Sequence, residues 1–320
     1  MKGRFAHLFG PVPSRRLGMS LGVDLVPYKT CTLDCVYCEV GPTTAPTLEV
    51  GEYISTREII DELDTYMQNP DRLDYITFSG SGEPLLHSGI GTILDHLKRH
   101  YPRFKTALLT NATQLAGPEA AEKLRGLDLI LPSLDAASQE VFERINRPRH
   151  GIRIDDVIEG LRSFRAETGI TMWLELFVLP GYNDSPEELQ LLKQALESID
   201  PDRVQLNTLD RPGVCSDLEP ASQETLQQIA DFLSPLQCEV VSGFSGGGQL
   251  PGTSDRSRSI LQTLSRRPCT SQDLAEALGV HLNEMNKQLR ILQEQNLIYP
   301  VQGGRGVFWK ALEPDGTENS

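Results

Sequence analysis

Short apolar segments rich in branched residues alternate with amphipathic segments over most of the chain. The apolar segments have the length of strands, and between them apolar positions recur at three- and four-residue spacing, which is typical of helices packed on one face. Strands are predicted at residues 20–27, 75–80, 105–111, 129–135, 172–181 and 204–210, with 238–243 as a further edge strand. Helices are predicted at residues 55–67, 154–167 and 185–199. Nearly continuous apolar strands in this order predict a parallel sheet covered by helices.

Two helix starts support these helices. Ser55 and Glu58 have the spacing of a capping box, and Ser185-Pro186 places an N-cap residue before a proline in the first turn. Six strand–helix units fit a full or partial (β/α) barrel better than a two-layer fold. In such a barrel the chemistry lies at the C-terminal ends of the strands, so the residues that follow each strand are the site candidates.

The composition changes at residues 242–255, where glycine, serine and proline dominate. We therefore predict a barrel domain over residues 1–243, a linker over 244–254, a second domain over 255–315 and a polar tail over 316–320. In the second domain, helices are predicted at 258–267, 270–279 and 282–298, the second of them capped by Thr270. A hairpin at 301–312 turns at Gly303-Gly304. Three helices and a β-wing predict a winged helix-turn-helix.

Net charge is −14 over 320 residues, and its distribution is uneven. From residue 251 onward there are eight Lys+Arg and eight Asp+Glu, so the first 250 residues carry the whole excess. A neutral winged helix on an acidic body is a weak DNA binder on electrostatic grounds. Its cations are Lys287 and Arg290 in the third helix and Arg305 and Lys310 in the wing. A nucleic acid and a protein are both open as its partner.

Location is predicted from segments that the sequence lacks. No apolar run approaches the ~18 residues of a membrane helix. The first residues show no apolar core of a signal peptide. We expect a cytoplasmic protein without a membrane partner. In a reducing compartment, clustered cysteines indicate a metal or catalytic site rather than disulfides.

The segment KTCTLDCVYCEVG, residues 29–41, supplies three cysteines directly after the first predicted strand. Buried or free thiols are one interpretation, and half of a zinc site is a second. A closed zinc site needs four ligands, whereas Cys215, Cys238 and Cys269 are isolated along the chain. The third interpretation is a 4Fe–4S cluster held by Cys31, Cys35 and Cys38, with the fourth iron open for catalysis.

The spacing Cys-x-x-x-Cys-x-x-Cys, with Tyr37 before the last cysteine, resembles the signature of the radical S-adenosylmethionine (radical SAM) superfamily. The resemblance implies a partial (β/α)6 barrel and two cofactors, a 4Fe–4S cluster and S-adenosylmethionine. It further implies reductive cleavage to methionine and a 5′-deoxyadenosyl radical, which abstracts hydrogen from a substrate. An electron donor such as flavodoxin or ferredoxin is then needed. The substrate itself is not identified by the sequence.

The same resemblance names cofactor-binding residues at later strand ends. SGSGEPLLH, residues 79–87, resembles the family's Gly-Gly-Glu-Pro motif, with Ser81 in place of the first glycine. Glu83 would accept from the ligand's ammonium, and backbone groups nearby would complete the site. The remaining residues implied to contact S-adenosylmethionine are Tyr37, Gly82, Pro84, Asn111, Ser133, Asp135, Leu179 and Asn207. Taken singly, most of these could also be turn or helix-capping residues.

Residues 9–215 resemble more closely the prokaryotic iron–sulfur oxidoreductase branch related to tRNA 4-demethylwyosine synthase. The wyosine enzyme carries a second cluster on upstream cysteines, and this chain has no cysteine before Cys31. This departure argues against wyosine chemistry, and an RNA-linked substrate and a small molecule both stay open. Two basic groups could meet phosphate or lie on a solvated surface. They are Arg15 with Arg16, and Arg144, Arg147, Arg149, His150 and Arg153.

Charged residues within or just after strands are candidates for handling substrate. Asp24 and Glu175 lie in apolar segments, where a sealed core would make them costly, and Arg211 could clamp a carboxylate or phosphate. The alternative for each is a structural ion pair. A second function class is a regulator whose cluster senses redox state or oxygen and whose winged helix reads DNA.

Overall fold

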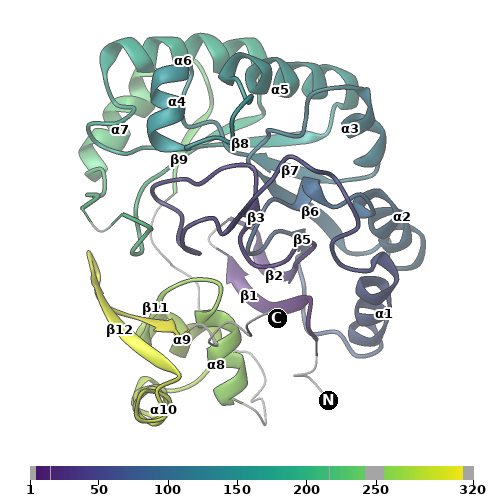
Figure 1. The fold of residues 1–320 in the computed structure, drawn as a ribbon, viewed down its shortest axis with the longest axis vertical. Helices are drawn as coiled ribbons and strands as arrows, with labels where there is room; N and C mark the ends of the chain where they lie inside the picture. Colours follow the sequence, from purple (N-terminus) through teal and green to yellow (C-terminus); the bar gives the residue numbers. More distant parts are fainter. Residues whose placement is uncertain (1–4, 15, 216, 242–255, 313–320) are drawn as a thin grey trace.

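The structure is a computed structural model that describes residues 5–14, 16–215, 217–241 and 256–312 (Figure 1). The predicted linker at 244–254 and the predicted tail at 316–320 lie outside the described residues. Within these ranges, none of the helices is long and apolar enough to cross a membrane.

In the described part of the chain, an eight-stranded sheet has the order β1-β2-β5-β6-β7-β8-β9-β10. β1 is antiparallel to β2, and every other neighbouring pair is parallel. The strands are β1 (Leu8–Ser14), β2 (Gly18–Val23), β5 (Tyr75–Phe78), β6 (Lys105–Thr110), β7 (Leu129–Pro132), β8 (Thr171–Phe177), β9 (Arg203–Asn207) and β10 (Cys238–Val240). This order confirms the predicted parallel sheet of a partial barrel, since β1 and β10 stand at its two ends.

Helices follow the strands and lie on the outer side of the curved sheet (Figure 1). They are α1 (Thr56–Met67), α2 (Ile90–His100), α3 (Pro118–Lys123), α4 (Gln139–Ile145), α5 (Ile154–Thr168), α6 (Pro186–Ile199) and α7 (Gln223–Phe232). Ser185 caps α6 by accepting from Glu188 N at 3.2 Å. Ser55 accepts from Glu58 N at 3.4 Å, but the Glu58 carboxylate pairs with His7 at 3.4 Å. Half of the predicted capping box at Ser55 is therefore present.

The sheet has two differently packed faces. Ile130 packs in the large core between the sheet and the helices, whereas Leu129 and Leu131 belong to a small cluster on the other face. Trp173 joins that inner cluster, and successive strand residues alternate between faces, so Glu175 also points to the barrel interior. The interior thus has an apolar floor and polar groups toward the C-terminal ends of the strands.

The winged-helix domain, residues 256–312, has a core of its own. Its elements are α8 (Arg256–Leu264), β11 (Cys269–Thr270), α9 (Ser271–Ala277), α10 (Leu282–Glu294), β12 (Ile298–Gly303) and β13 (Gly306–Ala311). Thr270 caps α9 in a full capping box with Asp273. The domain, green to yellow in Figure 1, lies beside β1, and α8 packs against that strand.

Candidate active site

The three-cysteine loop follows β2, and each of its sulfurs accepts a hydrogen bond from a different side-chain nitrogen. The pairs are Asn111 Nδ2 with Cys31 Sγ at 3.5 Å, Asn146 Nδ2 with Cys35 Sγ at 3.4 Å, and Lys29 Nζ with Cys38 Sγ at 3.1 Å. The two asparagines follow β6 and α4, and Lys29 precedes the short strand β3 (Thr30–Cys31). N–H donors around thiolates are what a metal–sulfur centre needs in its outer shell.

The Ser-Gly-Glu-Pro turn follows β5 and packs directly on the cysteine loop. A Cβ at Gly82 would come within 2.1 Å of Thr30 O, so only glycine fits there. Glu83 is buried and caps the short 3₁₀ turn Pro84–Leu86. Its carboxylate accepts from Thr110 Oγ1 at 2.7 Å, Asn111 N at 2.8 Å and Leu85 N at 3.0 Å. Burial raises the pKa of the Glu83 carboxyl, although these donors act to lower it.

Asp135, which follows β7, connects that strand to the cysteine loop by hydrogen bonds. Its Oδ2 accepts from Tyr37 Oη and from Asn146 Nδ2, the latter at 2.7 Å, and its Oδ1 accepts from Phe177 N at 3.0 Å. The Tyr37 ring stacks on Phe177 with centroids 4.0 Å apart. Burial raises the pKa of Asp135 to about 6 against the donors that hold it. One carboxylate therefore fixes an aromatic residue and a sulfur donor together.

A small cavity of about 40 Å³ joins several predicted residues to the cysteine loop. Its polar lining is Cys35, Tyr37, Asn111, Ser133, Asp135 and Asn146. Asn146 is buried, and its Oδ1 has no hydrogen-bond partner in the part of the chain that the structure describes. Because an unpaired buried acceptor costs free energy, this oxygen is suited to a ligand hydroxyl or amine.

Two predicted residues lie at the neighbouring strand ends. Leu179 is buried, and its backbone N donates to Asn183 Oδ1 at 2.8 Å. Asn207 ends β9, and its side-chain oxygen accepts from Thr208 N at 3.0 Å. Both residues lie at the C-terminal ends of strands. These hydrogen bonds are to neighbouring residues of the same loop.

Comparison with known proteins decides the family. Residues 25–192 match the model of the "Radical SAM superfamily", and residues 255–299 match that of a "Helix-turn-helix domain". The chain belongs to the radical SAM superfamily. It is 30% identical to a UPF0026 protein of Methanocaldococcus jannaschii, over 95% of this chain and 96% of that protein. The fold class predicted from sequence is thereby confirmed.

Two further comparisons are narrower in what they show. A protein of Brachyspira hyodysenteriae named GTPase Obg is 32% identical over 91% of this chain, which spans 43% of that relative's length. The crystal structure of a radical SAM methyltransferase from Sphaerobacter thermophilus matches with a TM-score of 0.53 at 17% identity, over 69% of this chain and 65% of that chain. This structural likeness shows the fold.

As a radical SAM enzyme, the chain uses a 4Fe–4S cluster and S-adenosylmethionine. Three thiols on one loop, each with an N–H donor, have the chemistry of cluster ligands. Among the described residues, the one set of three or more His, Cys, Asp and Glu ligand atoms that lie within 4.8 Å of each other is His7, Glu58 and Glu62. Sulfurs around a single Zn²⁺ would stand about 3.8 Å apart at ~2.3 Å from the metal. The three sulfurs do not all lie within 4.8 Å of one another, so as placed they do not surround one ion.

Burial and neighbouring negative charge affect the thiols themselves. Burial, and next the nearby Glu83 charge, raise the pKa of Cys31 to about 11. Burial also raises the pKa of Cys35 well above its ordinary value. Because cluster ligands are thiolates, binding of a cluster would release protons from Cys31 and Cys35.

The predicted substrate residues of the radical SAM barrel are all in ion pairs. Glu175 pairs with Arg16, which precedes β2. The carboxylate of Asp24 accepts from Ser81 N and from Arg266, and Arg211 Nη1 lies 3.2 Å from Glu39. Arg211 is buried, and its Nε has no partner among the described residues.

The exposed basic residues at the end of α4 and after it partly contact the barrel. Arg144 Nη2 donates to Gly181 O at 2.6 Å, and Arg147 Nη2 lies 3.7 Å from Cys215 Sγ. Cys215 itself donates its backbone N–H to Val36 O at 3.0 Å, beside the cysteine loop.

Sequence reasoning missed three residues that the structure brings to this site: Lys29, Asn146 and Arg266. Lys29 stands two residues before Cys31, and a lysine that close to three thiolate ligands is the sequence signal that could have been used. Asn146 and Arg266 lie 111 and 242 residues from their partners Cys35 and Asp24, and no local pattern marks them.

Proposed function

We propose that this enzyme cleaves S-adenosylmethionine reductively at the Cys31–Cys38 loop and uses the product radical to abstract hydrogen from a substrate in the barrel. The observation that carries the proposal is the set of three separately supported sulfurs packed against the Glu83 turn. When bound, the cluster and S-adenosylmethionine supply an electron and a scissile carbon–sulfur bond, which yield methionine and a 5′-deoxyadenosyl radical.

Cys31, Cys35 and Cys38 hold the cluster in this proposal, and Glu83 holds the ammonium of S-adenosylmethionine. Glu83 already accepts three hydrogen bonds, and a carboxylate offers roughly four acceptor positions. One position is left for an ammonium donor, whose charge would offset the burial that raises the pKa of the Glu83 carboxyl. Thr110 and the Asn111 N–H fix the direction in which that position points.

We assign Asp135 and Asn146, which line one cavity, to orientation of the nucleoside part of the ligand. The unpaired Asn146 Oδ1 lines the same cavity as Ser133. A ribose hydroxyl donated to that oxygen would satisfy it. Tyr37 and Phe177 form an apolar stacked wall beside it.

Substrate would lie in the barrel interior, above the apolar floor. Glu175 with Arg16, and Asn207, are the polar groups that we assign to its orientation. A polar substrate could replace the Glu175–Arg16 pair by forming its own contacts with the carboxylate and the guanidinium. We propose an RNA-linked or small-molecule substrate and a small protein reductant such as flavodoxin or ferredoxin.

The cleavage activity can be tested by anaerobic reconstitution with iron and sulfide, followed by dithionite and S-adenosylmethionine. Wild-type protein with about four irons should release 5′-deoxyadenosine. Cys38→Ala should lose the cluster and the product. Cys215→Ala is the matched control, because that thiol lies beside the loop without being an assigned ligand, and it should retain both. A Cys38→Ala protein with full activity would refute the ligand assignment.

The substrate class can be tested with material from cells grown in deuterated medium. RNA and small-molecule fractions are supplied separately to the reconstituted enzyme with unlabelled S-adenosylmethionine. Deuterium should enter 5′-deoxyadenosine with the fraction that contains substrate, because the radical takes its hydrogen from there. If neither fraction transfers deuterium while 5′-deoxyadenosine still forms, the proposal of an RNA-linked or small-molecule substrate is wrong.

A further inference from the structure

Arg266, which follows α8 of the winged-helix domain, reaches the mouth of the barrel. Its Nε and Nη2 lie 2.9 and 2.7 Å from Asp24 Oδ2. The guanidinium also stacks over the Phe9 ring of β1, 4.5 Å from the centroid. The Arg266 and Asp24 side chains are 16% and 10% exposed. This pair is therefore largely removed from water, where a missing partner is costly.

Asp24 is shared between the winged-helix domain and the Ser-Gly-Glu-Pro turn. Its other oxygen, Oδ1, accepts from Ser81 N at 2.9 Å. Gly80 has φ +142° and is so close that a Cβ would stand 1.5 Å from the same oxygen. Asp24 can hold the turn only because residue 80 has no side chain.

The path continues from the turn into the cysteine loop. Ser81 O accepts from Lys29 N at 2.9 Å, and Lys29 Nζ reaches Cys38 Sγ. Hydrogen bonds and one ion pair thus connect Arg266 to the turn that carries Glu83 and to a cluster ligand. The contacts pass through backbone groups of Ser81, whose position sets that of Glu83 two residues later.

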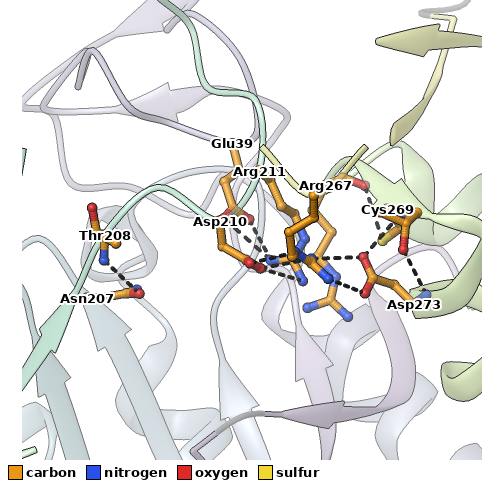
Figure 2. A network of polar contacts seen from close by, with 10 residues as sticks. Glu39, Asn207, Thr208, Asp210, Arg211, Arg267, Cys269 and Asp273 are labelled. Atoms are coloured by element: carbon orange, nitrogen blue, oxygen red, sulfur yellow. Dashed lines mark hydrogen bonds and ion pairs between the residues drawn. The ribbon is translucent and has the colours of Figure 1, made fainter. Parts of the chain in front are cut away.

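A second group of contacts joins the winged-helix domain to the barrel, and Figure 2 shows Asp273 of that domain facing Asp210 and Arg211 of the barrel. Arg305 pairs with Asp210 at 2.7 Å and with Asp273 at 3.0 Å, next to the buried pair of Arg211 and Glu39. A Cβ at Gly303 would come within 3.1 Å of Pro212 Cγ. The wing therefore faces the loop after β9.

Lys310 on β13 also lies toward the cluster loop. Burial lowers the pKa of its ammonium, and the charges of Cys38 and Glu39 oppose that effect. Of the two wing cations that the sequence offered for DNA, Arg305 pairs with the barrel through Asp210.

We propose that Arg266 is a positioning residue of the S-adenosylmethionine site, through which docking of the winged-helix domain holds the Ser81–Glu83 turn in its binding geometry. The proposal rests on the function proposed above. Domain docking and cofactor binding are then coupled, and the coupling is reciprocal, so S-adenosylmethionine also stabilises the docked domain. Arg266 acts through Asp24 and need not touch the cofactor.

The test uses the full-length, cluster-loaded protein without reductant. Binding of radiolabelled S-adenosylmethionine is measured by equilibrium dialysis for wild type, Arg266→Ala, Arg266→Lys and Arg290→Ala. Arg266→Ala should bind at least tenfold more weakly at equal iron content, and Arg266→Lys should fall between it and wild type, because lysine keeps the charge but not the paired donors. Arg290, exposed on α10, is the control and should leave affinity unchanged.

A second readout follows docking itself. Amide hydrogen exchange in β13 should slow when S-adenosylmethionine is added to wild type, and this slowing should vanish in Arg266→Ala. If Arg266→Ala does not fold, Asp24→Asn and Arg266→Lys carry the same test. The proposed coupling would be overturned if these variants bound S-adenosylmethionine with wild-type affinity. It would also be overturned if hydrogen exchange in β13 of the wild type did not change on addition of S-adenosylmethionine. A wild-type protein that binds no S-adenosylmethionine would instead overturn the proposed function.

Discussion

The Lys29 ammonium nitrogen lies 3.1 Å from Cys38 Sγ, and the Lys29 side chain belongs to a residue that is only 3% exposed. A positive charge held this close to a thiolate favours the more negative, reduced state of a cluster bound there. Lys29→Met should therefore lower the cluster's midpoint potential by ~60 mV or more, since about 60 mV corresponds to a factor of ten for one electron. A redox titration followed by electron paramagnetic resonance measures it.

Two controls define this prediction. Lys287→Met removes a lysine from an exposed helix position and should leave the potential unchanged. Lys29→Arg keeps the charge and should stay near wild type. An unchanged potential in Lys29→Met would show that the ammonium only fills space beside Cys38.

Asn146 should govern how firmly the cluster is held. Its amide donates to Cys35 Sγ and to Asp135 Oδ2, so Asn146→Ala removes one sulfur donor and loosens the carboxylate that fixes Tyr37. Losing an outer-shell donor of this kind costs roughly tenfold in metal affinity. Cluster loss to a chelator, followed by visible absorbance, should be about that much faster. Asn69→Ala, at an exposed position after α1, should lose its cluster at the wild-type rate.

Glu83 should separate cofactor binding from cluster binding. Glu83→Gln removes the negative charge proposed to meet the ammonium and places an amide group opposite the Thr110 and Asn111 donors. The variant should keep about four irons but bind S-adenosylmethionine at least tenfold more weakly. Equilibrium dialysis and iron analysis measure both. Loss of the irons together with the ligand would assign Glu83 to the architecture of the loop instead.

Asp135 should make stability depend on pH in a defined direction. Burial raises its folded-state pKa to about 6, against an ordinary value of 3.8, so the folded protein holds this proton more tightly than the unfolded chain. Relative to Asp135→Asn, wild-type stability should therefore fall as pH rises from 4 through 6 and level off above. The full change is of order 3 kcal/mol.

Urea unfolding of the cluster-free protein at pH 5 and 7.5 measures this difference. Asp155→Asn, at an exposed position in the first turn of α5, should give the same difference from wild type at both pH values. A larger wild-type advantage at pH 7.5 than at pH 5 would mean that the three donors outweigh burial at Asp135.

The barrel and its site edge were predictable because both depend on local sequence. Strand–helix order sets the parallel sheet, and parallel strands end at one edge, which places the residues after them together. β1 was missed because Gly10, Pro11 and Pro13 argue against a strand, yet Leu8–Ser14 pairs antiparallel with β2 at the sheet edge, where proline is tolerated.

The roles of individual side chains were harder to predict than their neighbourhood. Asn111 stays a predicted contact of S-adenosylmethionine, and in this structure its side-chain amide donates to Cys31 Sγ and Thr32 Oγ1. Which of two adjacent groups a side chain meets is decided by packing over a few ångströms, which spacing along the chain does not encode. Arg266 depended on how two separately folded cores meet.

The contacts between these two cores include the ion pairs of Arg266 with Asp24 and of Arg305 with Asp210, and ion pairs affect how the two domains can separate. Charges that separate in water are rehydrated, whereas separated apolar faces are left exposed to aggregation. At these ion pairs, separation of the winged-helix domain from the barrel returns charged groups to water. Ionic strength then controls access to the barrel. Salt screens the more exposed pair of Arg305 and Asp210 more than the buried pair of Arg266 and Asp24. A bulky substrate could enter the barrel while the winged-helix domain is separated from it. The domain would then return to its place before radical chemistry begins.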